Sequence, residues 1–188
     1  LERNIVQSTP VQAGCIPPML EWRDVIAKAP TGTGKTFAYG IPIVEHIDPE
    51  DESVQAVILA PTRELAMQIT DEMRQIAVCH EGVRLVCLYG GQPIGKQINA
   101  LKRRPQIVVA TPGRLSDHMK RRTVRLDRVQ TVVLDEADRM LDMGFIHDVR
   151  RIAEKLPEKL PGELIMWVLI VSELAVFCVC LLILLTLG

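Results

Sequence analysis

The stretch Ala29-Pro30-Thr31-Gly32-Thr33-Gly34-Lys35-Thr36 lies between a short apolar run, residues 24–29, and a helical pattern, residues 34–46. Its two glycines let backbone N–H groups turn inward around phosphate oxygens, and the start of the helix adds positive potential. Lys35 would place an ammonium group on the outer phosphates, and Thr36 would offer a hydroxyl to Mg²⁺. The strict pattern begins with glycine where this chain has alanine, and the rest is intact. The stretch therefore predicts a strand, a phosphate-binding loop and a helix.

A cluster of carboxylates forms the second signal. Asp135-Glu136-Ala137-Asp138 follows the apolar run at residues 129–134. A carboxylate at the end of a buried strand can hold the water shell of Mg²⁺, and the next one can orient an attacking water. On its own such a cluster is typical of a solvated helix start. Together with an upstream phosphate loop, it favours nucleotide hydrolysis.

Short β-branched runs alternate with amphipathic stretches along most of the chain. The expected strands are residues 24–29, 54–60, 83–89, 106–110 and 129–134. The expected helices are residues 34–46, 62–79, 94–101, 113–120 and 140–156. Continuous apolar runs suit strands that are buried on both faces, so the alternation predicts an α/β fold with a mostly parallel, doubly wound sheet. Pro42 predicts a kink or an end near Ile41 in the first of these helices. Residues 46–53 are acidic and rich in turn formers, which predicts a surface loop.

The composition excludes several classes of protein. The chain has 188 residues, with 22 Lys and Arg against 23 Asp and Glu, and 48% of its residues are hydrophobic. A disordered chain would lack this apolar content, and a strongly basic nucleic-acid coat would not be neutral. The five cysteines form no Cys-x-x-Cys pair, which argues against a zinc site and favours reduced thiols in the cytoplasm. The first 30 residues show no secretory signal. The four histidines are expected on the surface.

The C-terminal segment has a different composition. Residues 164–187 are apolar except for Ser172, Glu173 and Thr186. At about 1.5 Å per residue, a helix of this length would cross the roughly 30 Å hydrocarbon core of a bilayer. The composition predicts an apolar C-terminal helix and a membrane as a partner, with a domain at residues 1–159 and a hydrophobic tail at residues 160–188.

Six short motifs occur in a familiar order. They are Gln12, residues 29–36, Pro61-Thr62-Arg63-Glu64-Leu65-Ala66, Gly90-Gly91, Thr111-Pro112-Gly113-Arg114 and residues 135–138. This series resembles the first RecA-like domain of DEAD-box ATP-dependent RNA helicases, of the bacterial type. The resemblance covers residues 4–159 and implies a RecA-like phosphate-loop fold, ATP and Mg²⁺ as cofactors, and RNA as a partner.

The resemblance also implies roles for individual residues. Gln12 would read the adenine edge, because its amide offers one donor and one acceptor. The nucleotide would be held by Gln12, Thr31, Gly32, Thr33, Gly34, Lys35 and Thr36, and Mg²⁺ by Thr36 and Asp135. Lys35, Asp135 and Glu136 would be the catalytic residues, with Glu136 as the general base. The RNA sugar–phosphate backbone would be bound by Pro61, Thr62, Arg63, Gly90, Gly91, Thr111, Pro112, Gly113 and Arg114. Contacts to phosphate and ribose carry no sequence information, so sequence-independent binding is implied.

The chain departs from the family pattern in three places. The family has an adenine-stacking aromatic residue upstream of the glutamine, and only eleven residues precede Gln12. The Ser-Ala-Thr motif expected near Met166 is replaced, and Ser172 is the nearest hydroxyl after an apolar run. The second RecA-like domain, which closes on the nucleotide during hydrolysis, is not in this sequence. These departures predict a fragment that binds ATP and RNA without efficient turnover.

The missing motif bears on the fold as well. In RecA-like sheets the strand that leads into Ser-Ala-Thr is central, so its slot is empty here unless residues 164–171 fill it. An empty slot would leave two buried strand edges unpaired and would make the domain marginally stable.

Two further interpretations remain open. The tail is similar to the first membrane helix of haem–copper oxidase subunit III, which would make residue 160 a junction between unrelated sequences and the chain a membrane-anchored fusion. The other alternative is a catalytically silent module that binds nucleotide or RNA.

Overall fold

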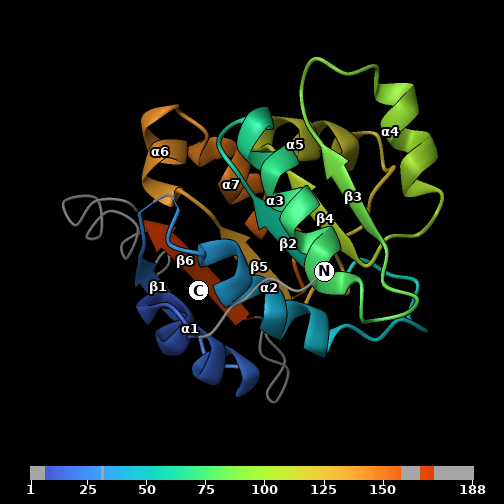
Figure 1. Cartoon of the computed structure of the whole chain (residues 1–188). Coiled ribbons are helices and arrows are strands. Elements are labelled where there is room, and N and C mark those ends of the chain that lie inside the picture. The colour runs from blue at the N-terminus through green and yellow to red at the C-terminus, as the bar shows by residue number, and fades with distance from the viewer. Residues whose placement is uncertain (1–6, 31, 158–165, 172–188) are drawn as a thin grey trace.

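The computed structural model describes residues 7–30, 32–157 and 166–171, and these form a three-layer α/β structure (Figure 1). All strand pairs in the described sheet are parallel, and the strand order is β1-β6-β5-β2-β4-β3. The strands are β1 (Val25–Lys28), β2 (Ala56–Leu59), β3 (Leu85–Leu88), β4 (Ile107–Ala110), β5 (Thr131–Leu134) and β6 (Met166–Val171). Every residue of β2, β4 and β5 is buried, as expected for central strands covered on both faces. The predicted α/β fold with a parallel sheet is confirmed.

Helices cover both faces of the sheet. The helices are α1 (Pro10–Leu20), α2 (Lys35–His46), α3 (Arg63–Ala77), α4 (Ile94–Leu101), α5 (Pro112–Lys120), α6 (Ala137–Asp142) and α7 (Ile146–Ala153). Helices α1, α2 and α3 pack into one core, and the apolar residues of α4 to α7 pack into the core on the opposite face. Parallel strands covered on both sides in this way require crossover connections, and each crossover here contains a helix.

The most informative difference from the sequence-based prediction is β6. Residues 166–171 form the strand between β1 and β5, with Val168 in register with Val25 on one side and Val133 on the other. Its backbone is anchored at both ends, because the Met166 amide donates to the Gln130 carbonyl at 2.8 Å and the Ala29 amide donates to the Val171 carbonyl at 3.2 Å. The central slot is therefore filled, and the reason for expecting marginal stability is wrong.

The apolar helix expected at residues 164–187 is not confirmed. Its residues 166–171 form a strand, while residues 164–165 and 172–187 lie outside the described part of the chain. Among the described residues, no helix has both the length and the apolar character that a membrane span needs. The boundary expected between residues 159 and 160 also falls outside the described ranges and stays a prediction.

Two helices at the start of the chain differ from the sequence-based prediction. Helix α1 was not expected, yet Thr9 and Gln12 form a capping box at its start and Pro10 occupies its first turn. Helix α2 continues through Pro42 to His46, so the predicted end near Ile41 is wrong. Ile43 and Val44, the two residues after the proline, are each 1% exposed, and their burial outweighs the lost hydrogen bond.

The helix predicted at residues 140–156 is two helices, α6 and α7. Gly144 separates them with a φ of +79°. The Gly144 amide donates to the Leu141 carbonyl at 2.9 Å, and the Phe145 amide donates to the Met140 carbonyl at 2.9 Å. This pair of bonds is a Schellman motif, which ends a helix by satisfying its last carbonyl groups.

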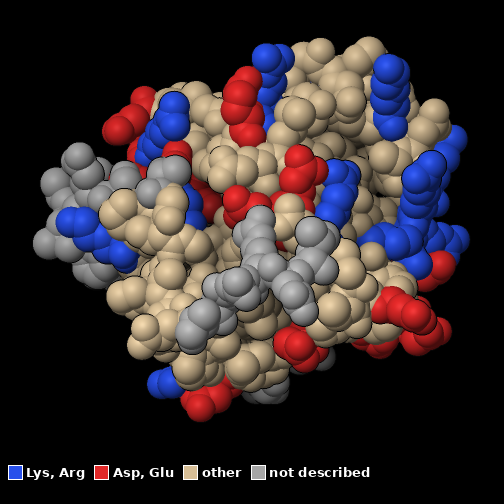
Figure 2. Space-filling model, viewed as in Figure 1, with Lys and Arg blue, Asp and Glu red and all other residues tan. Residues whose placement is uncertain are grey.

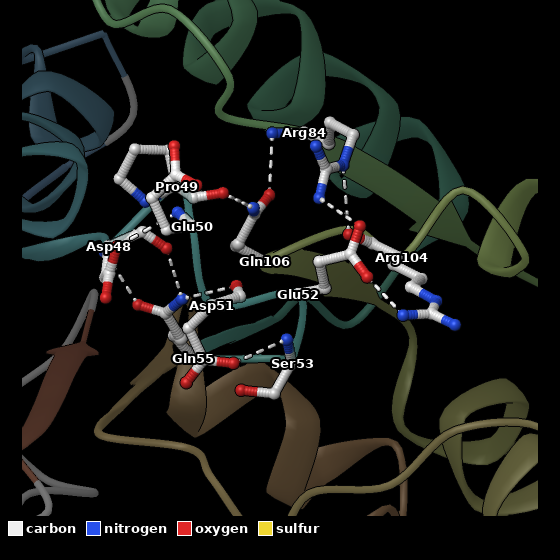
Figure 3. Close-up of polar contacts among 10 residues, drawn as sticks. All are labelled: Asp48, Pro49, Glu50, Asp51, Glu52, Ser53, Gln55, Arg84, Arg104 and Gln106. Carbon is white, nitrogen blue, oxygen red and sulfur yellow. Dashed lines mark hydrogen bonds and ion pairs between the residues drawn. The ribbon is translucent and has the colours of Figure 1, made fainter.

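The acidic loop before β2 is tied to the amino ends of the strands, as Figure 3 shows. Gln55 is buried and accepts a hydrogen bond from the Asp48 amide at 2.9 Å. Gln106 is also buried and donates to the Pro49 carbonyl at 3.0 Å. Glu52 forms ion pairs with both Arg84 and Arg104. The loop predicted at residues 46–53 is confirmed for residues 47–53, while His46 ends α2, and the loop lies at the edge of the sheet opposite to the phosphate loop.

Candidate nucleotide site and adjacent surface

The predicted motifs meet at one edge of the sheet. The phosphate loop follows β1, the Pro61 motif follows β2, Gly90-Gly91 follows β3, Thr111 follows β4, and Asp135 follows β5. Parallel strands end at the same edge, so the loops after them share one surface. Thr31, one of the predicted nucleotide-binding residues, lies outside the described residues.

Glycine geometry shapes the phosphate loop. Gly32 and Gly34 have φ values of +85° and +77°, a region that L side chains rarely adopt. The Thr33 hydroxyl donates to the Pro30 carbonyl at 2.7 Å and closes the turn. A Cβ added to Gly34 would lie 2.5 Å from Nε2 of Gln12, so a side chain there would displace the Gln12 amide.

A buried ion pair forms the centre of the site. Lys35 is the first residue of α2, and its Nζ lies 2.8 Å from Oδ1 of Asp135 and 3.5 Å from Oε1 of Glu136. Asp135 is fully buried and Lys35 is 6% exposed. Burial raises the pKa of the Asp135 carboxyl, and the Lys35 ammonium acts in the opposite direction. The structure thus brings Lys35 together with Asp135 and Glu136, which lie about a hundred positions later in the sequence.

Glu136 has an unusual backbone conformation. Its φ is +54°, and it occupies the position just before α6. Left-handed backbone is disfavoured for a non-glycine residue and is often found where function requires it. Oε2 of Glu136 also lies 3.3 Å from Nη1 of Arg139, so the carboxylate is held between two cations at the mouth of the phosphate loop.

Gln12 joins α1 to the phosphate loop. Its Nε2 donates to the Gly34 carbonyl at 3.2 Å, and its Oε1 accepts from the Thr9 amide at 3.0 Å. Both halves of the amide are therefore engaged within the chain. The predicted contact of Gln12 with adenine stays a prediction.

Magnesium ligands would have to be oxygen atoms, and two of the predicted ones are close together. Asp135 accepts a hydrogen bond from the Tyr39 hydroxyl at Oδ2, at 2.9 Å. The Thr36 side chain also contacts the Tyr39 hydroxyl and lowers its pKa, against the larger raising effects of burial and Asp135. The Thr36 hydroxyl and the Asp135 carboxylate, which both lie next to Tyr39, are the kind of hard oxygen ligands that Mg²⁺ prefers.

The residues predicted to bind RNA occupy the loops beside the phosphate loop. Thr62 caps α3 by accepting from the Leu65 amide at 3.3 Å. A Cβ on Gly91 would lie 3.6 Å from Nη1 of Arg63, so these two motifs are in contact. Arg114 donates to the Gln92 carbonyl at 3.0 Å and connects α5 to the same loop. The remaining members, Pro61, Gly90, Thr111, Pro112 and Gly113, belong to the same loops or to the first turn of α5.

The charge pattern of this face is mixed. Figure 2 shows basic and acidic side chains interspersed, with blue side chains gathered on the side where β3 and α4 lie. This agrees with a formal net charge of −1 over the chain. Any anionic polymer would therefore be bound by a few placed cations rather than by a uniform basic surface.

Sequence reasoning missed a buried network behind the Gly90-Gly91 loop. Gln97 donates from Nε2 to the Tyr89 carbonyl at 2.8 Å, and its Oε1 lies 3.0 Å from Nε2 of His118. His118 is fully buried, so its predicted surface position is wrong. Burial is the main cause that lowers the pKa of His118 below its ordinary value. No local sequence pattern predicts these contacts, because they join residues of α4, α5 and the end of β3, which are far apart in the sequence.

Comparisons with known proteins agree with this arrangement. Residues 9–170 match the family model of the DEAD/DEAH box helicase. The DEAD-box ATP-dependent RNA helicase CshA of Bacillus licheniformis is 55% identical over 151 residues, and that of Bacillus subtilis is 53% identical over 153 residues. The aligned regions cover 80% and 81% of this chain but only 31% of each relative.

Solved structures show the same fold. A DEAD box protein from Methanococcus jannaschii superposes with a TM-score of 0.82 at 35% identity, over 96% of this chain and 50% of that one. A hypothetical ATP-dependent RNA helicase from Sulfolobus tokodaii gives a TM-score of 0.76 at 36% identity, over 89% of this chain and 46% of that one. These matches give no support to the similarity between the C-terminal tail and a membrane helix of haem–copper oxidases.

Proposed function

This chain belongs to the DEAD/DEAH box helicase family, and from that premise we propose that it is the nucleotide-binding part of an ATP-dependent RNA helicase. The observation that carries the proposal is the buried contact of Lys35 with Asp135 beneath the two left-handed glycines of the phosphate loop. The chain spans about three tenths of the length of its curated relatives. The activity, substrate and partners of a whole helicase are therefore part of the proposal.

ATP and Mg²⁺ would be held by the residues that line this edge of the sheet. The loop at residues 32–34 and the first turn of α2 would surround the phosphates with backbone N–H groups. Lys35 would exchange the Asp135 carboxylate for phosphate oxygens. Thr36 and Asp135 would hold Mg²⁺, which neutralises the charge of the phosphates during their transfer. Glu136 would orient the attacking water, and its ion pairs with Lys35 and Arg139 hold its carboxylate at the mouth of the loop.

RNA would bind across the adjoining loops. Arg63 and Arg114 provide two cations about the Gly90-Gly91 loop, and glycine lets a sugar–phosphate chain approach the backbone closely. Such contacts position a strand without reading its bases. We therefore propose sequence-independent binding of single-stranded RNA, in which removing either arginine weakens the affinity for RNA a few-fold.

Hydrolysis and unwinding would need more than the described residues. Family members close two RecA-like domains on the nucleotide, so this chain by itself would bind ATP and RNA with little turnover. Ser172 follows β6 directly in the sequence, but the Ala-Thr of the family's Ser-Ala-Thr motif does not follow it. A cytoplasmic location is also proposed, and the free thiols of Cys15, Cys79 and Cys87 fit a reducing compartment.

Nucleotide binding is tested with a fluorescent ADP titrated into the chain and into Lys35→Ala. We expect Lys35→Ala to weaken binding by at least tenfold, because the variant loses the cation that faces the phosphates. Lys155→Ala removes the same charge from an exposed position and should bind as the wild type does. Circular dichroism at the assay temperature confirms that each variant is folded. Equal affinity of wild type and Lys35→Ala would refute the proposed site.

RNA binding is tested separately with a labelled oligouridine. Arg114→Ala should weaken binding and make the affinity less dependent on salt by about 0.7 of a counterion, the value for one phosphate of a single strand. Arg125→Ala is the matched control, because its side chain is 83% exposed and paired with Asp127. Binding of nucleotide or of RNA without any ATP turnover, even when both ligands are present, would favour the alternative of a catalytically silent module.

A further inference from the structure

Tyr39 lies beneath the phosphate loop and has no role in the family resemblance. It is the fifth residue of α2, four positions after Lys35, so both side chains project from the same face of the helix. Both reach Asp135, across the gap between α2 and the end of β5. Tyr39 and Asp135 are each 0% exposed, and the hydrogen bond between them is 2.9 Å long.

The two oxygens of Asp135 have different partners. Oδ1 faces Lys35 at 2.8 Å, and Oδ2 accepts from the Tyr39 hydroxyl. The phenol group of tyrosine carries its proton at neutral pH and a carboxylate can only accept, so the Tyr39 hydroxyl is the donor in this bond. The carboxylate is therefore fixed in rotation by one partner on each oxygen.

Nucleotide binding would remove one of these partners. Under the proposed function, Lys35 turns to the phosphates and Oδ1 of Asp135 loses its cation. A buried carboxylate with no other partner would then rotate or pull Lys35 back, because an unpaired buried charge is strongly disfavoured. The Tyr39 hydroxyl stays on Oδ2 throughout, and this leaves Oδ1 facing the loop.

We propose that Tyr39 is a positioning residue that holds the Asp135 carboxylate with one oxygen turned toward the phosphate loop, ready for the water shell of a nucleotide-bound Mg²⁺. This inference rests on the proposed function and adds a residue to it. Thr36 lies three positions before Tyr39 on α2 and is also buried, so Tyr39 is next to both residues that would hold the metal ion. Residues that orient metal ligands from behind change metal affinity by about 10- to 100-fold when they are removed.

The test measures how much Mg²⁺ strengthens nucleotide binding. A fluorescent ADP is titrated into the whole chain in EDTA and in excess MgCl₂, and the ratio of the two dissociation constants is the magnesium gain. Tyr39→Phe keeps the ring and removes only the hydroxyl. We expect an unchanged affinity in EDTA, within about twofold, and a magnesium gain reduced by about tenfold. Tyr89→Phe removes a hydroxyl elsewhere and should change neither value.

A double-mutant comparison separates positioning from packing. In an Asp135→Asn background, Tyr39→Phe should have no further effect on the magnesium gain, since the carboxylate that it orients is gone. A full magnesium gain in Tyr39→Phe would overturn the inference, and so would an equal loss of affinity in EDTA and in MgCl₂. If the wild type binds ADP through Lys35 without any magnesium gain, the role of Tyr39 fails while the nucleotide site stands. If the wild type binds no ADP at all, the proposed function fails and the inference fails with it.

Discussion

Replacing Ile170 by alanine tests whether β6 is part of the folded sheet. Ile170 is 1% exposed and packs in the core shared with α1, α2 and α3, next to Ala27 of β1. The substitution removes the equivalent of roughly three methylene groups, at about 0.8 kcal/mol each. Adding the cavity that remains, the free energy of unfolding should fall by about 2.5–4 kcal/mol, within the range of about 2–5 kcal/mol for such changes.

Urea denaturation followed by circular dichroism measures this loss. With a denaturant dependence of about 2 kcal/mol per molar urea, the midpoint should fall by about 1–2 M. Leu169→Ala should have a comparable effect, because Leu169 is 2% exposed and packs in the opposite core. Val78→Ala is the control, since Val78 is 73% exposed and should change stability by no more than about 0.5 kcal/mol. If the two β6 variants unfold at the same midpoint as the control, β6 does not lie between β1 and β5, and the reasoning is refuted.

Three further outcomes follow from single sites. Gly34→Ala should reduce the affinity for fluorescent ADP, because the φ of Gly34 is +77° and the new Cβ would lie 2.5 Å from Nε2 of Gln12. Unchanged affinity would contradict this loop geometry. Acidification should destabilise the protein. The pKa of His118 is lowered in the folded state, so the unfolded chain binds the proton first as the pH falls below about 6.5. The free energy of unfolding should then fall by up to about 1.4 kcal/mol per pH unit. His118→Gln should flatten that slope in urea titrations at pH 7.5 and pH 5.5, and a slope equal to that of the wild type would exclude His118 as its cause. Gly144→Ala should lower the free energy of unfolding by about 1–2 kcal/mol, because the φ of Gly144 is +79°. Nothing lies within 4 Å of the new Cβ, so the substitution adds only backbone strain. An unchanged thermal midpoint would argue against the break between α6 and α7.

Short-range chemistry explains which parts of the fold were predictable. The phosphate loop is a strand, a glycine turn and a helix within residues 24–46, so its identity depends on neighbours in the sequence. The strands β1 to β5 are continuous apolar runs between turn residues, and all five lie within the predicted ranges. The break at Gly144 was visible as a glycine in a helical pattern. It was missed because apolar periodicity continues across it, and the capping hydrogen bonds are what end the helix.

The nature of residues 166–171 could not be decided from composition. A strand buried on both faces and a membrane helix are both uninterrupted apolar runs, and periodicity does not distinguish them when the run is short. Sheet topology does distinguish them, because β1 and β5 each leave an edge that must be paired. The empty slot was recognised from the family resemblance, and the structure fills it with Met166–Val171.

Counting the partners of a buried charge could have led from the sequence to Tyr39. A carboxylate at the end of a fully buried strand has two oxygens to satisfy, and Lys35 can serve only one of them well. The second donor must come from an element that already faces Asp135, and the first turns of α2 are the part of the chain that Lys35 brings there. Within those turns, the residue one turn after Lys35 is the tyrosine, and a hydroxyl on a rigid ring can cross to the next strand where a shorter side chain cannot. Phenylalanine at this position would fill the same space and leave Oδ2 without a donor, so it is the hydroxyl, and not the ring, that ties α2 to the chemistry of Asp135.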